Sequence, residues 1–162
     1  MRVLGALGAH SNIIQLTEWY PLAGTNCYAV VYPYVPFVEI DGSDEAVTRQ
    51  YMRDLLSALA HCHECGVIYR DVKPGNVLFD PRVGRAFLID FDCAKEYDPY
   101  DRPTSKIGTD GYMAPEVENE APGGYDLSVD VYSAGVVFLE LIYGVEMKGD
   151  LIREDIETVL DK

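Results

Sequence analysis

Residues 69–90 read Tyr-Arg-Asp-Val-Lys-Pro-Gly-Asn-Val-Leu-Phe-Asp-Pro-Arg-Val-Gly-Arg-Ala-Phe-Leu-Ile-Asp, and this stretch decides the fold. Two short apolar runs, 76–79 and 85–89, flank the turn-forming residues 80–84, a pattern that predicts a β-hairpin. In an antiparallel hairpin, the start of the first strand and the end of the second strand lie side by side. We therefore expect Asn76 and Asp90 to lie together at the open end of this hairpin.

The loop before the hairpin adds two charged side chains to that end. Asp71 stands five residues before Asn76, and Lys73 lies between them. Carboxylate and amide oxygens suit Mg²⁺, which proteins typically hold with one or two carboxylates together with the phosphates of a substrate. A lysine beside such ligands suits a phosphate oxygen. The alternative is that these residues are only turn formers in a solvated loop, which is the favoured interpretation for any one of them taken alone.

Two long helices are predicted on either side of this stretch. The first begins after Ser43, the expected N-cap, and ends at Gly66. Its apolar side chains recur at helical spacing, namely Val47, Tyr51, Leu55 and Leu59. The second helix, residues 129–143, is apolar nearly all round and ends at Gly144, so we expect it to be buried on most sides.

The remaining segments predict one strand and one long loop. Residues 28–32 are β-branched and aromatic, which predicts a strand that Pro33 ends. From Asp92 to about Gly124 the chain is rich in Asp, Pro, Gly and Tyr, without a sustained period. That loop is longer than the roughly 12–15 residues beyond which irregular connections are usually functional or disordered. No repeat or linker divides the chain, so we expect one continuous unit.

Composition and charge bound the class of protein. The 162 residues, 48% hydrophobic and 25% charged, have the size and composition of one globular domain. With 13 basic and 27 acidic residues the net charge is −14, which disfavours general binding to nucleic acid. Four scattered cysteines favour a reducing compartment over a secreted disulfide framework. No apolar run predicts a membrane span, and the short N-terminal apolar run lacks a signal-peptide cleavage pattern.

Three motifs, in order, carry a resemblance to a known family. Residues 69–76 resemble the protein-kinase catalytic loop, H-R-D-x-x-x-x-N, with Tyr in place of His. Residues 90–92, Asp-Phe-Asp, resemble D-F-G with its last residue changed, and residues 108–116, Gly-Thr-Asp-Gly-Tyr-Met-Ala-Pro-Glu, resemble the A-P-E end of an activation segment. The chain is thus similar to a eukaryotic-type serine/threonine protein kinase domain. The resemblance implies an α+β protein-kinase-like fold, with a mostly helical C-lobe and part of the N-lobe sheet.

The resemblance also implies roles for the residues of the expected site. Asp71 would accept or orient the proton of a substrate hydroxyl, and Lys73 would stabilise charge on the transferred group. Asn76 and Asp90 would hold Mg²⁺ bridging the phosphates of ATP. Thr109, in the Gly-Thr pair typical of serine/threonine kinases, would bridge Asp71 and Lys73; the plain alternative is a turn residue. The implied activity is ATP-dependent phosphoryl transfer to Ser/Thr hydroxyls of a protein substrate.

A nucleotide site follows from the same resemblance. Residues 30–35 match the fifth strand and hinge of the family, with Tyr32 at the gatekeeper position. Backbone groups of Pro33 and Val35 would contact adenine. Leu78 would form the apolar floor beneath the ring.

Two further segments resemble parts of the kinase scaffold. Residues 10–13, His-Ser-Asn-Ile, are similar to the H-P-N-I segment that follows helix αC. Residues 125–135 are similar to the start of the central helix, where Asp130 would brace the backbone of the catalytic loop. A carboxylate also favours a helix N-terminus, and this second role is compatible with the first.

Arg70 resembles the arginine of kinases that are regulated by phosphorylation of the activation segment. Thr104 and Ser105 are the available acceptors for an upstream activating kinase, and Lys95 is a second cation for the phosphate. The alternative, equally supported, is that both hydroxyls are exposed and unmodified. The expected partners are therefore ATP, a protein substrate and this upstream kinase, with no nucleic acid and no membrane.

The resemblance covers nearly the whole chain but only the middle of a kinase domain. The Gly-rich loop, the third-strand Lys, the helix αC Glu and the late C-lobe helices have no counterpart in the sequence. We therefore expect a partial kinase domain over residues 1–162, with 1–36 as N-lobe remnant and hinge and 37–162 as C-lobe core, in a truncated form of the enzyme. The alternative is a catalytically impaired pseudokinase or scaffold that binds protein partners. Asp92, in place of Gly, adds a carboxylate that could repel phosphate or bind metal itself.

Residues 61–65, His-Cys-His-Glu-Cys, look like half of a zinc site. A structural zinc needs four ligands, usually from two separated pairs, and the sequence has no second Cys/His cluster. We therefore expect these residues to pack at the end of the first long helix. The cysteine usage and the family together imply an intracellular protein of the cytoplasm or nucleus.

Overall fold

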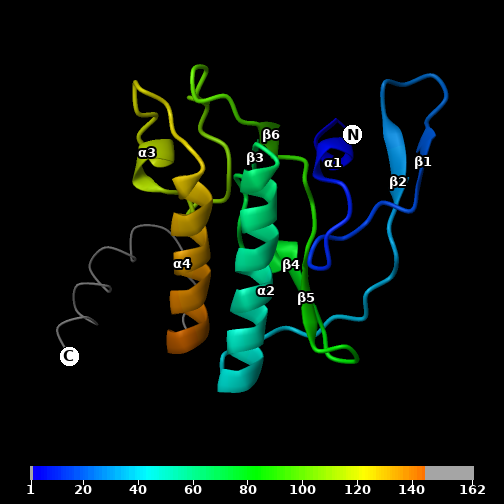
Figure 1. Cartoon of the computed structure of the whole chain (residues 1–162), viewed down its shortest axis with the longest axis vertical. Helices are drawn as coiled ribbons and strands as arrows, with labels where there is room; N and C mark the ends of the chain where they lie inside the picture. Colours follow the sequence, from blue (N-terminus) through cyan, green and yellow to red (C-terminus); the bar gives the residue numbers. More distant parts are fainter. Residues whose placement is uncertain (1, 145–162) are drawn as a thin grey trace.

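The structure of the protein, a computed structural model, describes residues 2–144 apart from the side chains of Arg2 and Leu4. Along the chain the elements are α1 (Arg2–Leu7), β1 (Glu18–Pro21), β2 (Tyr28–Val31), α2 (Glu45–Glu64), β3 (Val67–Ile68), a 3-10 turn (Pro74–Asn76), β4 (Val77–Asp80), β5 (Arg85–Leu88), β6 (Lys95–Glu96), α3 (Pro115–Glu118) and α4 (Ser128–Tyr143). Helix α2 lies between α4 and the β4–β5 hairpin, and the β1–β2 hairpin lies at the edge of the molecule (Figure 1). The end of the predicted C-lobe core, 145–162, lies outside the described residues.

The hairpin predicted between residues 76 and 89 is confirmed. Strands β4 and β5 pair antiparallel, with Val77 opposite Leu88 and Asp80 opposite Arg85. The connecting turn closes at Gly84, whose φ of +61° is a left-handed conformation that glycine adopts without steric cost. The open end of the hairpin therefore carries the residues just before Val77 and just after Leu88.

Both outer edges of this hairpin pair with segments from the first forty residues. Leu88 donates its N–H to the Asn12 carbonyl (2.8 Å) and accepts from the Ile14 N–H (3.0 Å). On the other edge, the Val38 N–H donates to the Phe79 carbonyl (3.0 Å). Each edge of the hairpin is thus paired by backbone hydrogen bonds, which supply partners for buried groups of Leu88 and Phe79.

Helix α2 has Asp44 rather than Ser43 as its N-cap. The Asp44 carboxylate accepts from the backbone N–H groups of Ala46 and Val47 (2.9 and 3.1 Å). The Ser43 hydroxyl instead donates to Asp41 (2.6 Å). The prediction of Ser43 is therefore wrong, because Asp44 has the extended backbone and the acceptor within reach of the first turn.

Both long helices end at the glycine that the sequence predicts. Helix α2 ends at Glu64 and is followed by Gly66 with φ +69°. Helix α4 ends at Tyr143, and Gly144, with φ +64°, donates its N–H to the Glu140 carbonyl (2.8 Å). A left-handed residue after the last turn is the usual way to end a helix, and glycine carries no Cβ penalty there.

Helix α4 is buried on one side only, so the prediction of burial on most sides is wrong. Its inward side packs against α2 and contains Asp130, Val136 and Val137. Within residues 2–144, the opposite side exposes between 38% and 55% of five apolar or aromatic side chains, namely Val131, Tyr132, Phe138, Ile142 and Tyr143. The apolar composition therefore extends beyond the surface that the described residues cover.

Of the two remaining predictions, the strand over 28–32 is confirmed and the irregular loop after Asp92 is only partly correct. The strand predicted over 28–32 is present as β2, paired with β1 through the contacts Trp19–Val30 and Tyr20–Ala29. The segment after Asp92 is more regular than the composition indicates, since it contains β6, which pairs with β3, and the short helix α3. Residues of this segment form a second small core with the start of α4, made of Ile68, Met113, Ala114, Val117, Tyr125 and Val129.

The main core lies between α2, the β4–β5 hairpin and the inward side of α4. Its fully buried members include Leu55, Leu59, Val67, Leu88 and Val137. This core includes Val67 of β3 and Leu88 of β5, and so holds both strands in place. The candidate site lies between the C-terminal ends of these two strands. In residues 2–144, no helix has the length and apolar character needed to cross a membrane.

Candidate active site

The loop between β3 and the 3-10 turn is held from below by one buried carboxylate. Asp130, in the first turn of α4, is 0% exposed and accepts from the backbone N–H groups of Tyr69 (2.9 Å) and Arg70 (2.8 Å). A third bond comes from His63 in the last turn of α2, whose Nε2 lies 2.8 Å from Asp130 Oδ2. Arg70 has φ +71°, a conformation that a side chain disfavours. The two N–H bonds to Asp130 hold the loop in this bend.

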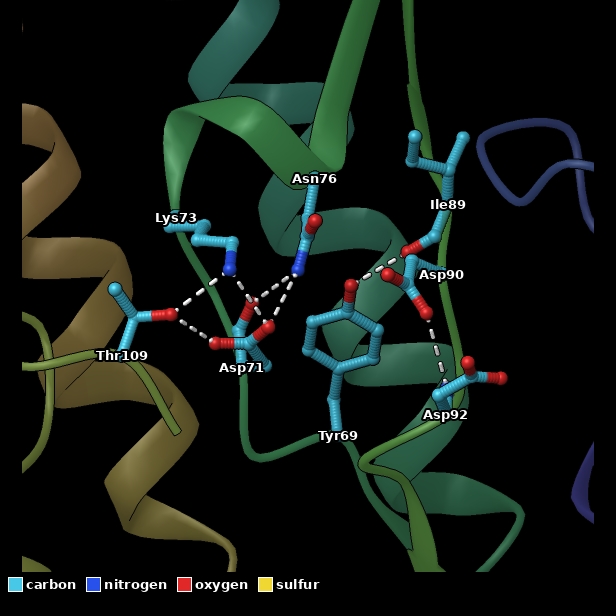
Figure 2. A network of polar contacts seen from close by, with 8 residues as sticks. All are labelled: Tyr69, Asp71, Lys73, Asn76, Ile89, Asp90, Asp92 and Thr109. Carbon is cyan, nitrogen blue, oxygen red and sulfur yellow. Dashed lines mark hydrogen bonds and ion pairs between the residues drawn. The ribbon is translucent and has the colours of Figure 1, made fainter. Parts of the chain in front are cut away.

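Above the bend, three side chains form a closed set of contacts (Figure 2). The Thr109 hydroxyl donates to Asp71 Oδ1 (2.6 Å) and accepts from Lys73 Nζ (2.8 Å). Lys73 Nζ also lies 3.0 Å from Asp71 Oδ2. Thr109 therefore joins a carboxylate and an ammonium from residues almost forty positions away in the chain. The Asp71 side chain is 11% exposed and the Lys73 side chain 30% exposed, so the ion pair is shielded from water mainly on the Asp71 side.

Asn76 adds an oriented amide on the other side of Asp71. Its Nδ2 donates to the Asp71 carbonyl (2.8 Å) and to Asp71 Oδ2 (2.9 Å), and the residue is 5% exposed. Both bonds use the nitrogen, so the amide oxygen of Asn76 is turned away from Asp71. An oxygen fixed in this way is a suitable ligand for a hard divalent cation.

Asp90 follows β5 and faces the same region. It has φ +55° and accepts from the Asp92 N–H at Oδ1 (3.2 Å). Figure 2 shows its side chain on the segment after β5 that runs beside Tyr69, across from the turn that carries Asn76. Burial raises the pKa of Tyr32, and the charges of Asp92 and Asp90 raise it further, which places the phenol near both carboxylates.

The donor set fits Mg²⁺ held jointly with phosphate. Asn76 and Asp90 offer hard oxygen ligands, and Mg²⁺ in proteins takes one or two such ligands and completes its shell with water and phosphate. Among the residues that the structure describes, no group of three or more His, Cys, Asp or Glu side chains is placed to hold a metal by itself. The zinc alternative gains no support there either, because His63 bonds Asp130 and His61 Nε2 lies 2.7 Å from the Leu7 carbonyl.

Tyr69, where the kinase motif has His, links the two halves of this site. Its hydroxyl donates to the Ile89 carbonyl, and its ring packs edge-on against Phe91 at 5.1 Å between centroids. Burial raises the pKa of Tyr69 far above its usual range, so the phenol stays protonated and remains a donor. The loop that carries Asp71 and the segment that carries Asp90 are therefore fixed relative to one another.

The residues expected to hold adenine are not all in one cavity. Leu78 lines a cavity of about 660 Å³ that also includes Lys73 and Thr109. Pro33 and Val35 are absent from its lining; Pro33 is exposed and Val35 half-buried. The structure thus brings Leu78 to the same cavity as Lys73 and Thr109 but does not bring the two hinge residues there.

Arg70 is connected to the segment that carries the expected phosphorylation sites. Its Nε donates to the Cys93 carbonyl (2.7 Å), and its Nη1 lies 3.4 Å from the Tyr125 hydroxyl. That hydroxyl in turn donates to the Ser105 carbonyl (2.9 Å). Thr104 and Ser105 are both exposed residues.

Sequence reasoning missed two residues that shape the site. His63 was expected only to pack, yet it bonds the carboxylate that holds the loop. Tyr125 links Arg70 to the backbone of Ser105. In both cases the partner lies far along the chain, and no local pattern reports such a contact.

Comparisons with known proteins identify the family to which the chain is similar. A family model described as the protein kinase domain matches residues 1–159. The chain is 39% identical over 100 residues to the serine/threonine-protein kinase AtPK1/AtPK6 of Arabidopsis thaliana, covering 62% of this chain and 21% of the relative. It is 30% identical over 139 residues to the "Probable casein kinase II subunit alpha homolog" of Encephalitozoon cuniculi, covering 83% of this chain and 43% of the relative. It is also 30% identical over 146 residues to the SNF-related serine/threonine-protein kinase of Rattus norvegicus, covering 83% of this chain and 19% of the relative.

The chain therefore belongs to the protein kinase family. The predicted α+β class is confirmed. The matched part of the chain spans 21%, 43% and 19% of the length of these three relatives, respectively.

Proposed function

We propose that this chain supplies the catalytic loop and the metal-binding residues of a serine/threonine protein kinase, which transfers phosphate from ATP to protein hydroxyls. The observation that carries the proposal is the closed contact set of Asp71, Lys73 and Thr109, with the Asn76 amide fixed against Asp71. The names of the relatives support Ser/Thr as acceptors.

In this proposal each side chain has one task. Asp71 accepts or orients the proton of the substrate hydroxyl, since a carboxylate within hydrogen-bond reach is what general base catalysis requires. Lys73, 3.0 Å from Asp71, supplies positive charge beside the transferred group. Asn76 and Asp90 would hold Mg²⁺, which when bound with ATP neutralises phosphate charge. Thr109 keeps Asp71 and Lys73 in register.

The nucleotide contacts and the lobe division are part of the same proposal. Leu78 lies beneath the adenine ring, and backbone groups of Pro33 and Val35, which are outside the cavity that Leu78 lines, would have to approach the ring from the hinge when nucleotide binds. Residues 1–36 then form N-lobe remnant and hinge, and residues 37–162 form C-lobe core.

Four free cysteines support a location inside the cell, in the cytoplasm or nucleus.

Regulation would act through the activation segment. A phosphate added to Thr104 or Ser105 by an upstream kinase would find Arg70 close by, already connected to Ser105 through Tyr125. Intact-mass analysis after co-expression with candidate upstream kinases tests this. If no phosphate is found on residues 98–109, the regulatory part of the proposal is wrong.

The test of the catalytic proposal is phosphate transfer from Mg-ATP to Ser/Thr peptides by the complete gene product. Asp71→Asn should lower the rate by about 10²- to 10⁴-fold, the usual contribution of a general base. Glu118→Gln, the same chemical change at an exposed residue of α3, should leave the rate unchanged. If Asp71→Asn keeps the full rate, Asp71 has no catalytic role.

One observation favours a second candidate, a pseudokinase or scaffold. Asp92 adds a carboxylate next to Asp90, and together their charges act on Tyr32, so phosphate would meet extra negative charge. The transcript sequence upstream of the Met1 codon separates the two functions. A Gly-rich loop and a V-A-x-K strand encoded there favour the enzyme, and an in-frame stop favours the scaffold.

A further inference from the structure

Two histidines stack on one another where the N-terminal segment meets helix α2. His10, which follows α1, and His61, on α2, have ring centroids 4.6 Å apart and planes inclined by 17°. We propose that this pair is a proton-sensitive contact, which holds residues 7–14 against α2 and β5 while His10 is neutral and releases them when His10 is protonated. The proposal goes beyond the catalytic function and does not depend on it.

The hydrogen bonds indicate which nitrogens of His10 carry a hydrogen and that Nε2 of His61 carries one. His61 Nε2 lies 2.7 Å from the Leu7 carbonyl, and since a carbonyl only accepts, this nitrogen carries the hydrogen. His10 Nδ1 accepts from the Asn12 N–H (3.2 Å), so this nitrogen carries none. His10 Nε2, 3.4 Å from the Ser57 hydroxyl, holds the remaining hydrogen. The contact as built therefore requires a neutral His10.

Protonation of His10 removes this arrangement in two ways. The added hydrogen on Nδ1 would face the Asn12 N–H, so two donors would meet and the bond would be lost. The new charge would also lie against the His61 ring. The pKa of His10 is lowered, mainly by burial and secondly by the charge of His61. The Glu64 carboxylate, also on α2, acts in the opposite direction and raises the His10 pKa.

The direction of the pH effect follows from this lowered pKa. A histidine whose pKa is lower in the folded chain than its ordinary value of 6.5 destabilises the fold when it is protonated. The stabilisation is therefore fully present above pH 6.5 and declines as the pH falls from there through the lower pKa of the folded state.

The segment that this contact holds is also tied to the strand that leads to Asp90. Asn12 Nδ2 donates to the Ala86 carbonyl (3.0 Å), and the Asn12 carbonyl accepts from the Leu88 N–H (2.8 Å). Leu7 and Ile13, on either side of His10, are 3% and 2% exposed. Release of the segment would therefore expose core side chains and remove a backbone partner of β5, two residues before Asp90.

Hydrogen exchange of the full chain at pH 7.5 and pH 5.5, corrected for the intrinsic exchange rate, tests the proposal. The wild type should lose protection at pH 5.5 in residues 7–14 and at the Leu88 amide. His10→Gln keeps an acceptor for Asn12 but does not titrate, so its protection should not change with pH. Ser57→Ala leaves both rings in place and should retain the wild-type response.

Two results would overturn the proposal: an unchanged exchange rate in the wild type, or a pH response that persists in His10→Gln. An NMR titration of the wild type gives a second test that needs no variant. The His10 pKa in the folded chain must lie below the value measured for His10 in the urea-unfolded chain. An equal or higher value excludes a proton-driven release.

Discussion

The most direct test of how the catalytic loop is held is the change Asp130→Ala. Asp130 is 0% exposed and accepts from the Tyr69 and Arg70 N–H groups and from His63. Alanine leaves the Tyr69 N–H buried and unpaired, at a cost of about 1–3 kcal/mol. The Arg70 N–H is less deeply buried and costs about 1 kcal/mol, at the low end of the same range. We expect the free energy of unfolding to fall by about 2–4 kcal/mol.

That loss is large compared with the stability of a typical domain, about 5–15 kcal/mol. Asp130→Asn should lie between the wild type and alanine, because one amide oxygen can accept from only one of the two N–H groups well. The matched control is Asp126→Ala, which removes a half-buried carboxylate that accepts from the Ser128 N–H (2.9 Å). We expect that control to cost about 1 kcal/mol, as for other helix-start carboxylates.

Urea unfolding followed by circular dichroism measures these differences. Hydrogen exchange adds a local readout, since the Tyr69 and Arg70 amides should lose protection in Asp130→Ala and keep it in the control. If Asp130→Ala costs no more than Asp126→Ala, the loop is held by other contacts and the reasoning is refuted.

Three further predictions follow from single contacts. Gly42→Ala should destabilise the fold strongly, because its Cβ would lie 1.6 Å from the backbone carbonyl oxygen of Leu141 in α4. The control Gly75→Ala places its Cβ in open space, so its urea midpoint of unfolding should equal that of the wild type. At pH 8, Cys62 should resist iodoacetamide while exposed Cys27 reacts, as measured by peptide mass spectrometry. Burial raises the Cys62 pKa to about 12, so at this pH only about one Cys62 thiol in 10⁴ is a thiolate. Mg-ATP should raise the melting temperature of the 162-residue chain little or not at all, since the sequence has no Gly-rich loop or third-strand Lys; a clear rise that Asp90→Ala abolishes would contradict this.

The sequence predicts well what depends on neighbours in the chain. The hairpin follows from two apolar runs and a turn, and the ends of both long helices follow from Gly66 and Gly144. The N-cap of α2 is wrong by one residue because Ser43 and Asp44 are both good caps, and only the backbone conformation decides between them. Local patterns thus fix element type more firmly than element boundaries.

Contacts between distant residues limit what could be predicted of the site. The resemblance to protein kinases implies that Thr109 bridges Asp71 and Lys73, and the three side chains are in contact in the structure. No periodicity indicates that His63 reaches Asp130, because that contact exists only once α2 and α4 have packed together. The roles of these side chains in a reaction stay predictions.

The contacts of Asp130 with the catalytic loop have a consequence for sequence change over evolutionary time. The Asp130 carboxylate accepts hydrogen bonds from the backbone N–H groups of residues 69 and 70, and these groups do not depend on which side chains those residues carry. A histidine-to-tyrosine exchange at position 69 therefore leaves both bonds to Asp130 available, although the new side chain must still fit the buried space beside Phe91. Position 130 has no such latitude, because a side chain there needs two acceptor oxygens to bond both amides.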